Sequence, residues 1–413
     1  MEQSYYFGNR ERIYQGIEDN SLLVLFAGHA PRQSADQYYN FFCNRNFLYA
    51  TGCNEEGIIL LAERRAGKIS ETLYLRRPDL LAERWSGRRL KADEAIAISG
   101  IQRIAYLDQF QSEFHQRATS SQFDQLYLDL TKLTAEEPAN EEHRFAHSCQ
   151  KEYPAFPVRN IHLHFSHLRA IKQPCEIAAM RESIRITGEA IKAMMRASRP
   201  GMWEYQYKAI FDHVLTDHDV LEPGFPPIIS AGQNNFCIHY YSYSGQAQDG
   251  DMVLNDVGAR WKGIVNDVSR AWPCNGKFTE RQRLLYECAL RSSDYMFSII
   301  KPGMLHEDVD RLAREHNYEQ LHQLGLVDSY EEIGKLMWHG GAHHVGLDVH
   351  DDVVRGGPLQ PGMIFCVDIG IYCEEWGIGF RLEDNCLVTE DGCENLSRHI
   401  PRTIKEIEAA MAK

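Results

Sequence analysis

The chain has 413 residues, of which 44% are hydrophobic and 25% charged, and its formal net charge is −14 at pH 7. These values are typical of a globular protein with two or three domains, and the acidic balance argues against nucleic acid as a partner, because phosphates bind basic surfaces. No segment has the roughly 20 apolar residues that cross a bilayer, and the first residues lack the apolar core of a secretory signal. The eleven cysteines are scattered without a CxxC pair, as in proteins of a reducing compartment. We therefore expect a cytoplasmic protein that contacts neither nucleic acid nor membrane.

The first third of the chain alternates short apolar runs with amphipathic stretches. Buried strands are predicted at residues 22–27, 57–62, 72–75 and 104–107. Helix-like stretches are found at residues 80–85 and 121–133. This alternation predicts a small α/β domain. Residues 134–160 lose the periodicity and include Pro138, Pro154 and Pro157, so we interpret them as the connection that closes a first domain, 1–160.

A second domain, 161–413, is predicted to begin with a long amphipathic helix. Apolar residues recur at helical spacing from Ile177 to Met194, and the pattern stops before Pro200-Gly201-Met202. A second helix-like stretch also ends in a Pro-Gly-Met triplet, at Pro302, and each triplet precedes an acidic helical segment. The repetition indicates an internally duplicated domain.

Residues 253–272 are predicted to form a β-hairpin that carries two aspartates. A turn centred between Trp261 and Lys262 would place Asp256 directly opposite Asp267, on one face and with Cβ atoms roughly 5 Å apart. Opposed like charges destabilise a sheet unless a cation neutralises them. The alternative is a pair of solvated aspartates beside a turn, and this hairpin alone does not decide between the two.

Residues 363–389 are predicted to form a second hairpin of the same kind. A turn centred between Glu375 and Trp376 sets Asp368 opposite Glu383, and both acids interrupt strongly apolar strands. Buried carboxylates are almost always paired, which favours a cation site here. Arg381 lies on the same face as Glu383, where it orients a ligand carboxylate or forms a plain salt bridge.

Two further segments supply histidines. Residues 338–352 contain four, His339, His343, His344 and His350, next to glycines that favour a loop. One histidine as a metal ligand and others as proton donors or oxyanion stabilisers would suit an amide hydrolase. His239, in residues 228–245, is a weak candidate by itself.

Together these segments resemble the pita-bread metallopeptidases, the family of methionine aminopeptidase, prolidase and Xaa-Pro aminopeptidase, from about residue 161 to the C-terminus. Asp256 stands in a D-x-G strand, and Asp267 follows eleven residues later. His343 follows an H-G pair by four residues and precedes a G-L-D-V-H run, while Glu383 stands in an R-x-E-D strand. Residues 37–55 resemble the accessory domain of Xaa-Pro aminopeptidases and prolidases, which methionine aminopeptidases lack.

The resemblance implies an α/β (α+β) architecture, a small N-terminal accessory domain followed by a duplicated pita-bread catalytic domain, and a set of site residues. The implied ligands of two divalent metal ions are Asp256, Asp267, His343, Asp368 and Glu383. By the same matching His239, His339 and His350 bind substrate or handle protons, and Arg381 supports the ligands and binds substrate. Asp368 departs from the family's glutamate and is shorter by one C–C bond, roughly 1.5 Å.

The implied activity is hydrolysis of the bond between an N-terminal residue and a following proline. Mn²⁺ is the expected metal, with Co²⁺ or Zn²⁺ as alternatives, and Asp368, His350 and His239 are the expected catalytic residues. Two other hypotheses stay open: a prolidase that cleaves only dipeptides, with Arg355 holding the free carboxylate, and a catalytically impaired relative that binds peptides. The resemblance also implies a homo-oligomer.

Overall fold

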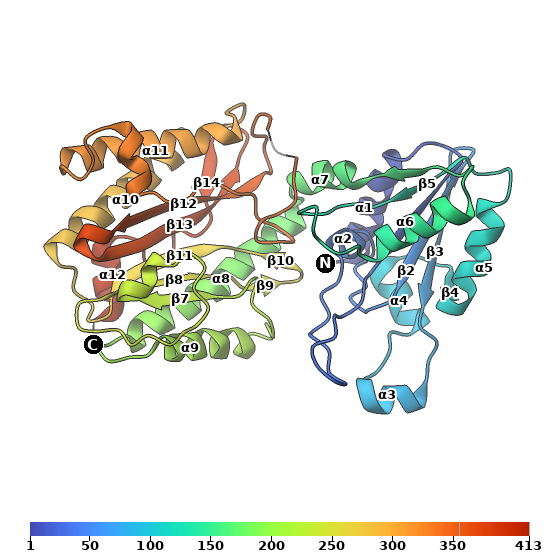
Figure 1. Ribbon diagram of the computed structural model, residues 1–413, viewed down its shortest axis with the longest axis horizontal. Helices are drawn as coiled ribbons and strands as arrows, with labels where there is room; N and C mark the ends of the chain where they lie inside the picture. Colours follow the sequence, from blue (N-terminus) through green and yellow to red (C-terminus); the bar gives the residue numbers. More distant parts are fainter. Residues whose placement is uncertain (355, 413) are drawn as a thin grey trace. The chain divides into compact units, whose positions relative to one another are not determined.

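The computed structural model describes residues 1–354 and 356–412 and divides into two compact units, Met1–Leu168 and Arg169–Lys413. Figure 1 labels the helices and strands of both units. Among the described residues, no helix combines the length and the apolarity that a membrane crossing requires.

The N-terminal unit is built on one mixed six-stranded sheet in the order β4-β3-β2-β1-β5-β6. Its strands are β1 (Ser21–Phe26), β2 (Ile59–Arg65), β3 (Lys68–Leu75), β4 (Ile104–Tyr106), β5 (Gln125–Leu128) and β6 (Val158–Asn160). Its helices are α1 (Gln3–Gln15), α2 (Arg45–Thr51), α3 (Leu80–Ser86), α4 (Ala92–Ser99), α5 (Leu107–Ala118), α6 (Glu141–Glu152) and α7 (His162–Ala170), the last of which extends into the second unit. The four predicted strands are confirmed as β1 to β4, and the predicted helix at residues 80–85 is confirmed as α3.

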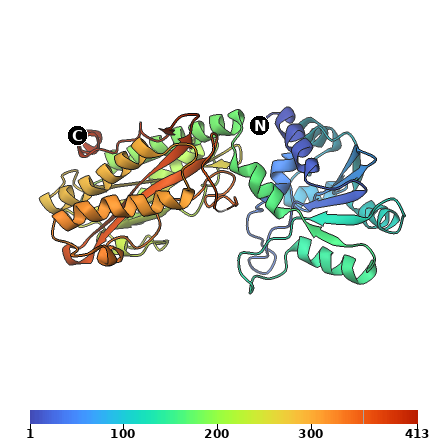
Figure 2. The same cartoon turned by 90° about the horizontal axis from the view of Figure 1, so that it is seen from above.

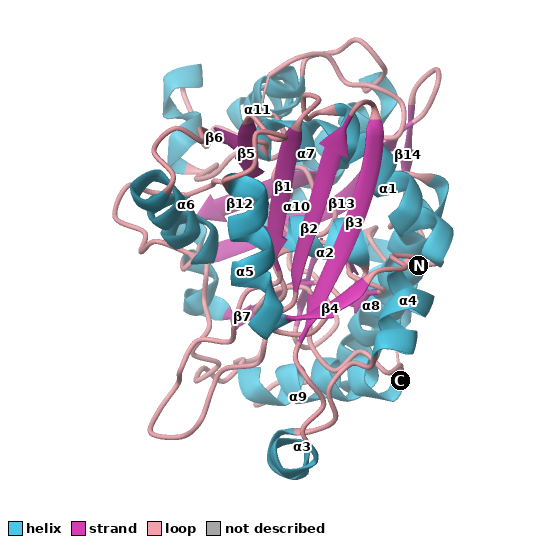
Figure 3. Ribbon diagram, turned by 90° about the vertical axis from the view of Figure 1, so that its right-hand side faces the viewer, coloured by secondary structure: helices cyan, strands magenta, loops and turns pink. Residues whose placement is uncertain are grey.

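Helices cover both faces of this sheet, as Figure 3 shows for α5 in front of the strands and α2 behind them. Phe110 and Phe114 of α5 pack with Leu22, Val24 and Phe26 of β1 in one hydrophobic core. Because β1 is buried on both faces, its sequence is a continuous apolar run rather than an alternating one.

Two predictions in this unit are wrong. Residues 121–133, predicted to be helical, instead contain β5, a buried strand that pairs in parallel with β1 and β6. Residues 134–160, interpreted as a connection without regular structure, contain α6 and β6. Asn140 caps α6, with its side chain accepting a hydrogen bond from the His143 amide, and the helix buries Ala146 and Cys149 against the sheet. Both segments take their structure from contacts with parts of the chain that are distant in sequence. The local spacing of apolar residues does not reveal such contacts.

The C-terminal unit repeats one motif twice, which confirms the predicted duplication. Each copy has two helices and a three-stranded sheet: α8 (Pro174–Ala197) and α9 (Glu204–Asp217) precede sheet β11-β8-β7, and α10 (Glu280–Ile299) and α11 (His306–Gln323) precede sheet β12-β13-β14. The strands are β7 (Ile228–Ala231), β8 (Met252–Val257), β9 (Arg260–Trp261), β10 (Ile264–Val265), β11 (Val268–Pro273), β12 (Ile364–Cys373), β13 (Ile378–Val388) and β14 (Cys393–Asn395). Short 3₁₀ turns, η1 (Gly232–Phe236), η2 (Tyr330–Lys335) and η3 (Glu374–Trp376), and a last helix, α12 (Ile404–Met411), complete the unit. Figures 1 and 2 show the strands lying between α8 and α9 on one side and α10 and α11 on the other.

Helix α8 forms as its sequence predicts. Pro174 occupies its first turn, and the Glu176 carboxylate accepts a hydrogen bond from the Gln173 amide at 2.8 Å, which closes the N-terminus. The predicted apolar face is buried, including Met180, Ile184 and Ile191. The helix ends at Ala197, before the Pro-Gly pair.

The two predicted hairpins are present, but only the second has the predicted register. Asp368 pairs directly with Glu383 across β12 and β13. In the first hairpin Asp256 pairs with Ser269, and Asp267 lies two residues before that serine, so the two aspartates are diagonal neighbours on one face. The turn is at Lys262-Gly263, one residue later than predicted, because both central residues of a tight two-residue turn take positive φ angles and glycine suits the second.

Candidate metal centre

Four buried carboxylates and one histidine come from the two hairpins and the loop at residues 338–352. Asp256 lies in β8, Asp267 directly precedes β11, Asp368 lies in β12 and Glu383 in β13, and their exposed fractions are only 2–8%. Strand β13 contacts both β8 and β11, so the carboxylate-bearing faces of the two hairpins meet. His343 lies in the loop, as predicted.

The closest grouping of donor atoms has four members: Asp267, His343, Cys366 and Glu383, hereafter the donor cluster. One ligand atom from each lies within 4.8 Å of the others. His343 Nε2 is 3.3 Å from Glu383 Oε1 and 3.6 Å from Asp267 Oδ2. The structure therefore brings three of the five predicted ligands together with a thiol that the sequence prediction did not include.

Asp256 and Asp368 flank the donor cluster, each with a cationic or polar partner. Arg381 donates to Asp256 Oδ2 at 2.8 Å, which makes Arg381 the partner of a predicted ligand. Asp368 Oδ2 is 3.2 Å from His339 Nδ1, and no atom of Asp368 belongs to the donor cluster among the residues described. The shorter side chain at position 368 thus lies beside His339, whose Nδ1 is also 2.9 Å from the Gly340 carbonyl oxygen.

Several carboxylate oxygens at this site are left without a hydrogen-bond donor. Within the described part of the chain, no hydrogen bond reaches Asp256 Oδ1, Asp267 Oδ1, Asp368 Oδ1 or Glu383 Oε1, although all four are buried. Buried, unpaired carboxylate oxygens are costly, and divalent cations neutralise them. The donor set and these unpaired atoms fit a centre for divalent metal ions.

The acid–base properties of the group without metal follow from burial and crowding. Burial and the neighbouring Asp256 and Glu383 carboxylates raise the pKa of Asp267 well above its usual range, and burial and Glu383 raise the pKa of Asp368 in the same way. Burial opposes ionisation of Asp256 as well, but the charge and hydrogen bond of Arg381, a hydrogen bond with Asp267 and the charge of His343 together lower the pKa of that carboxyl. The arrangement therefore carries protons when no cation is present, and a cation would displace them.

His343 is oriented by the backbone. Its Nδ1 lies 3.1 Å from the Val349 carbonyl oxygen, which accepts a hydrogen bond from Nδ1 only when that nitrogen carries a proton. Nε2 faces Asp267 and Glu383, and it would be left to donate its electron pair to a cation, the arrangement typical of histidine ligands.

The other predicted histidines lie at different distances from this centre. The His350 ring lies against the His343 ring, with 4.4 Å between centroids, and His350 is exposed. His339 Nε2 lies 3.0 Å from the Tyr372 hydroxyl, and that hydroxyl accepts a hydrogen bond from Arg381 at 2.9 Å.

His239 is exposed, and the carbonyl oxygen of the residue before it, Ile238, accepts a hydrogen bond from Arg381. The fourth histidine of the loop, His344, stacks on His306 and takes no part in the donor cluster.

Sequence reasoning missed the residues that hold the site loops in place. Asp351, next to His350, accepts from Arg169 at 2.5 Å and from Lys172 at 2.7 Å. Asp310 of α11 accepts from the Gly341 amide in the same loop. None of these carries a local motif, because each pairs with a residue far away in the sequence.

Glu204 fixes the segment that carries His239. Its buried carboxylate accepts hydrogen bonds from the Ala231 and Gly245 amides and from the Tyr240 hydroxyl, at 2.8, 2.6 and 2.7 Å. Sequence offers one signal: Glu204 is the acidic first residue of α9.

Replacing Glu204 by glutamine is expected to lower the free energy of unfolding by roughly 2–3 kcal/mol, because these three donors and the Asn234 side-chain amide lose a charged acceptor. Urea unfolding measures this change, and amides 231–245 should exchange hydrogen faster. Glu390→Gln, an exposed position, is the control and should leave both unchanged. Equal stability of the two variants would contradict the anchoring role.

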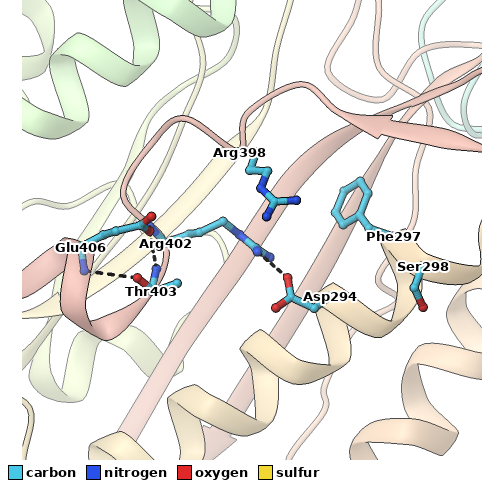
Figure 4. A pocket seen from close by; sticks show the side chains of 7 residues that line it. All are labelled: Asp294, Phe297, Ser298, Arg398, Arg402, Thr403 and Glu406. Atoms are coloured by element: carbon cyan, nitrogen blue, oxygen red, sulfur yellow. Dashed lines mark hydrogen bonds and ion pairs between the residues drawn. The ribbon is translucent and has the colours of Figure 1, made fainter.

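A cavity of about 340 Å³ in the same unit is separate from this centre. Figure 4 shows its lining: Asp294, Phe297, Ser298, Arg398, Arg402, Thr403 and Glu406. Arg402 donates hydrogen bonds to Asp294 in the lining and to Asp384 behind it. Thr403 and Glu406 cap the N-terminus of α12. Its polar groups thus serve the packing of α10, β13 and α12.

Comparison with known proteins places this geometry in a family. Residues 178–390 match metallopeptidase family M24, and residues 6–127 match the aminopeptidase P N-terminal domain. The chain is 31% identical to the Xaa-Pro aminopeptidase of Escherichia coli (strain K12), over 97% of this chain and 96% of that protein. Human Xaa-Pro aminopeptidase 3 is 30% identical over 97% of this chain and 82% of its own length.

Solved structures agree. A structure from Bacillus anthracis matches with a TM-score of 0.97 and 34% identity, over 100% of this chain and 98% of that one. Aminopeptidase P from E. coli with the inhibitor Pro-Leu matches with a TM-score of 0.91 and 29% identity, over the same shares. The chain therefore belongs to metallopeptidase family M24 and, within it, to the aminopeptidase P branch.

Proposed function

We propose that this protein is a dinuclear-metal aminopeptidase that hydrolyses the bond between an N-terminal residue and a following proline. The observation that carries the proposal is the convergence of Asp267, His343 and Glu383, with unpaired carboxylate oxygens, in a chain of the aminopeptidase P branch. When bound, a pair of divalent cations would supply a hydroxide nucleophile near neutral pH and would polarise the scissile carbonyl.

The protein's own residues are assigned the remaining steps. Asp256, Asp267, His343, Asp368 and Glu383 would hold the cations, and Arg381 keeps Asp256 in place. Asp368 accepts the proton of the attacking water, or Glu383 does so where Asp368 is too short. His350 and His239, both exposed, hold the developing oxyanion and the proline residue of the substrate. His339, 3.2 Å from Asp368, orients that carboxylate.

The direct test is turnover by metal-loaded protein of an Xaa-Pro-Xaa tripeptide, the matching Xaa-Ala-Xaa tripeptide and an Xaa-Pro dipeptide. We expect release of the first residue from the Xaa-Pro-Xaa peptide and little from the Xaa-Ala-Xaa peptide. No turnover of any peptide by protein that holds two metal ions would overturn the proposal.

The alternative is a prolidase, favoured by 27% identity to human Xaa-Pro dipeptidase over 98% of this chain and 92% of that protein. Its predicted carboxylate-binding group, Arg355, lies outside the described residues. Faster turnover of the dipeptide than of the tripeptide in the same assay would favour this alternative.

Asp368 motivates the second alternative, an impaired relative that binds peptides. Asp368→Glu is expected to raise metal affinity and kcat/KM by about tenfold or more, because one added C–C bond extends the carboxylate by roughly 1.5 Å towards the donor cluster. Metal analysis and peptide assays measure both quantities. Asp391→Glu, the same change at an exposed turn, is the control. Weaker metal binding in Asp368→Glu would show that the site is built for the shorter acid.

We further propose two divalent cations per chain, a homo-oligomer and a cytoplasmic location. Mn²⁺ suits a carboxylate-rich site, and a Zn-substituted E. coli aminopeptidase P in complex with product is among the similar structures, with a TM-score of 0.92. Elemental analysis after loading with each metal gives the count, and light scattering gives the oligomer. A monomer in light scattering would contradict the proposed homo-oligomer. Fewer than one metal ion per chain after loading would contradict the proposed pair of cations.

A further inference from the structure

Cys366 lies within the metal centre rather than beside it. It stands in β12 two residues before Asp368, so both side chains project from the same face of the strand. It pairs across the sheet with Asn385 and is fully buried. Its Sγ is one of the four atoms of the donor cluster, together with Asp267, His343 and Glu383.

The surroundings of Cys366 differ from those of an ordinary buried cysteine. A structural cysteine acts as a small apolar side chain among other apolar groups. Cys366 instead faces Asp267 and Glu383, each of which carries an oxygen that no hydrogen bond reaches in the described chain. Cys373, at the end of the same strand, is also buried but belongs to no such group among the residues described.

Asp368 lies across the sheet from Glu383, but no atom of its carboxylate belongs to the donor cluster among the described residues. Its Oδ2 lies 3.2 Å from His339 Nδ1. The four atoms that do converge are one imidazole nitrogen, one sulfur and two carboxylate oxygens. Four mixed nitrogen, sulfur and oxygen donors are typical of Zn²⁺, whereas Mn²⁺ prefers oxygen.

We propose that Cys366 Sγ is a ligand of the divalent cation held by Asp267, His343 and Glu383, and that it makes this position selective for borderline-soft cations such as Zn²⁺ over Mn²⁺. This inference rests on the proposed metal centre. On binding, the Cys366 S–H bond breaks, a sulfur–metal bond forms and one proton leaves to solvent, with no change of oxidation state. The predicted ligands outside the donor cluster, Asp256 and Asp368, would offer only oxygen donors to a second cation.

X-ray absorption at the zinc edge tests the ligand directly. With full-length protein loaded with Zn²⁺, we expect a sulfur scatterer at about 2.3 Å beside nitrogen and oxygen at about 2.0–2.1 Å. The sulfur shell should disappear in Cys366→Ser and remain in Cys373→Ala. Absence of sulfur from the wild-type spectrum overturns the inference even if the variants fold poorly, and so does a sulfur shell that survives in folded Cys366→Ser.

Competition between metals tests the selectivity. Removing the thiolate is expected to shift the preference of the protein from Zn²⁺ towards Mn²⁺ by about tenfold or more, measured by elemental analysis after equilibration with both ions. Cys373→Ala should keep the wild-type ratio. An unchanged ratio in Cys366→Ser would overturn the selectivity.

The same samples separate this inference from the proposed function. Two bound metals and Xaa-Pro turnover without a sulfur ligand would reject only the role of Cys366. Sulfur-ligated Zn²⁺ without peptidase turnover under any metal would reject the proposed function and leave Cys366 as a ligand. Failure to bind any metal would reject both.

Discussion

Glu383→Gln is expected to lower kcat/KM on Xaa-Pro peptides by at least about a thousandfold, since metal stabilisation of the transition state contributes several kcal/mol. Glu383 occupies the middle of the centre. Its Oε1 lies 3.3 Å from His343 Nε2, and its Oε2 accepts from Ser269 at 2.8 Å. An amide in its place removes one negative charge and offers an N–H group to the cations, so bound metal should fall to one ion per chain or fewer.

The control for this prediction is Glu375→Gln, the same chemical change at an exposed position in the turn of the same hairpin. That variant should keep wild-type metal content and turnover. Circular dichroism confirms that both variants fold. Glu383→Gln protein that binds two metals and keeps more than a tenth of the activity would remove Glu383 from the ligand set.

Structure could be predicted from the sequence most accurately where neighbouring residues determine it, as in the register of the second hairpin. The register of Asp368 against Glu383 followed from two long apolar strands around a polar turn, and the structure has that register. The register of Asp256 failed by two residues, although the two aspartates still share a face. A turn that is shifted by one residue moves each cross-strand pairing by two residues. Because side chains alternate between the two faces of a strand, such a shift changes the partner of Asp256 but leaves both aspartates on the same face.

Groups that act over long sequence distances were beyond sequence reasoning. Asp351 gains its role from Arg169 and Lys172, and Glu204 from donors up to forty-one residues away. Cys366 is different, because its place two residues before Asp368 already set it on the ligand face. What the sequence could not show is that the thiol, and not the Asp368 carboxylate, lies within the donor cluster, while Asp368 Oδ2 lies 3.2 Å from His339 Nδ1.

The acid–base properties of the metal-free centre have a consequence for stability. Folding raises the pKa of Asp267 and of Asp368 through burial and neighbouring carboxylates. The folded protein therefore holds protons that the unfolded chain has lost above about pH 4, so the stability of metal-free protein falls as pH rises from there through the raised values. Burial lowers the pKa of His343, but the hydrogen bond and charge of Glu383 help to raise it overall. The stability of the metal-free protein therefore falls further as pH rises above about 6.5, where the unfolded histidine has lost its proton.

Removal of metal by a chelator is therefore expected to abolish peptidase turnover and to lower Tm by about 10 °C at pH 8, since saturating ligand contributes about 4 kcal/mol and each kcal/mol moves Tm by about 2–4 °C in a unit of this size. At pH 5 the loss should be smaller, because protons then replace the cations on Asp267 and Asp368. Differential scanning calorimetry with and without chelator measures both shifts. Glu383→Gln protein, already short of metal, should respond far less to the chelator. A loss of Tm that is equal at pH 5 and pH 8 would show that the buried carboxylates are not where the cations bind.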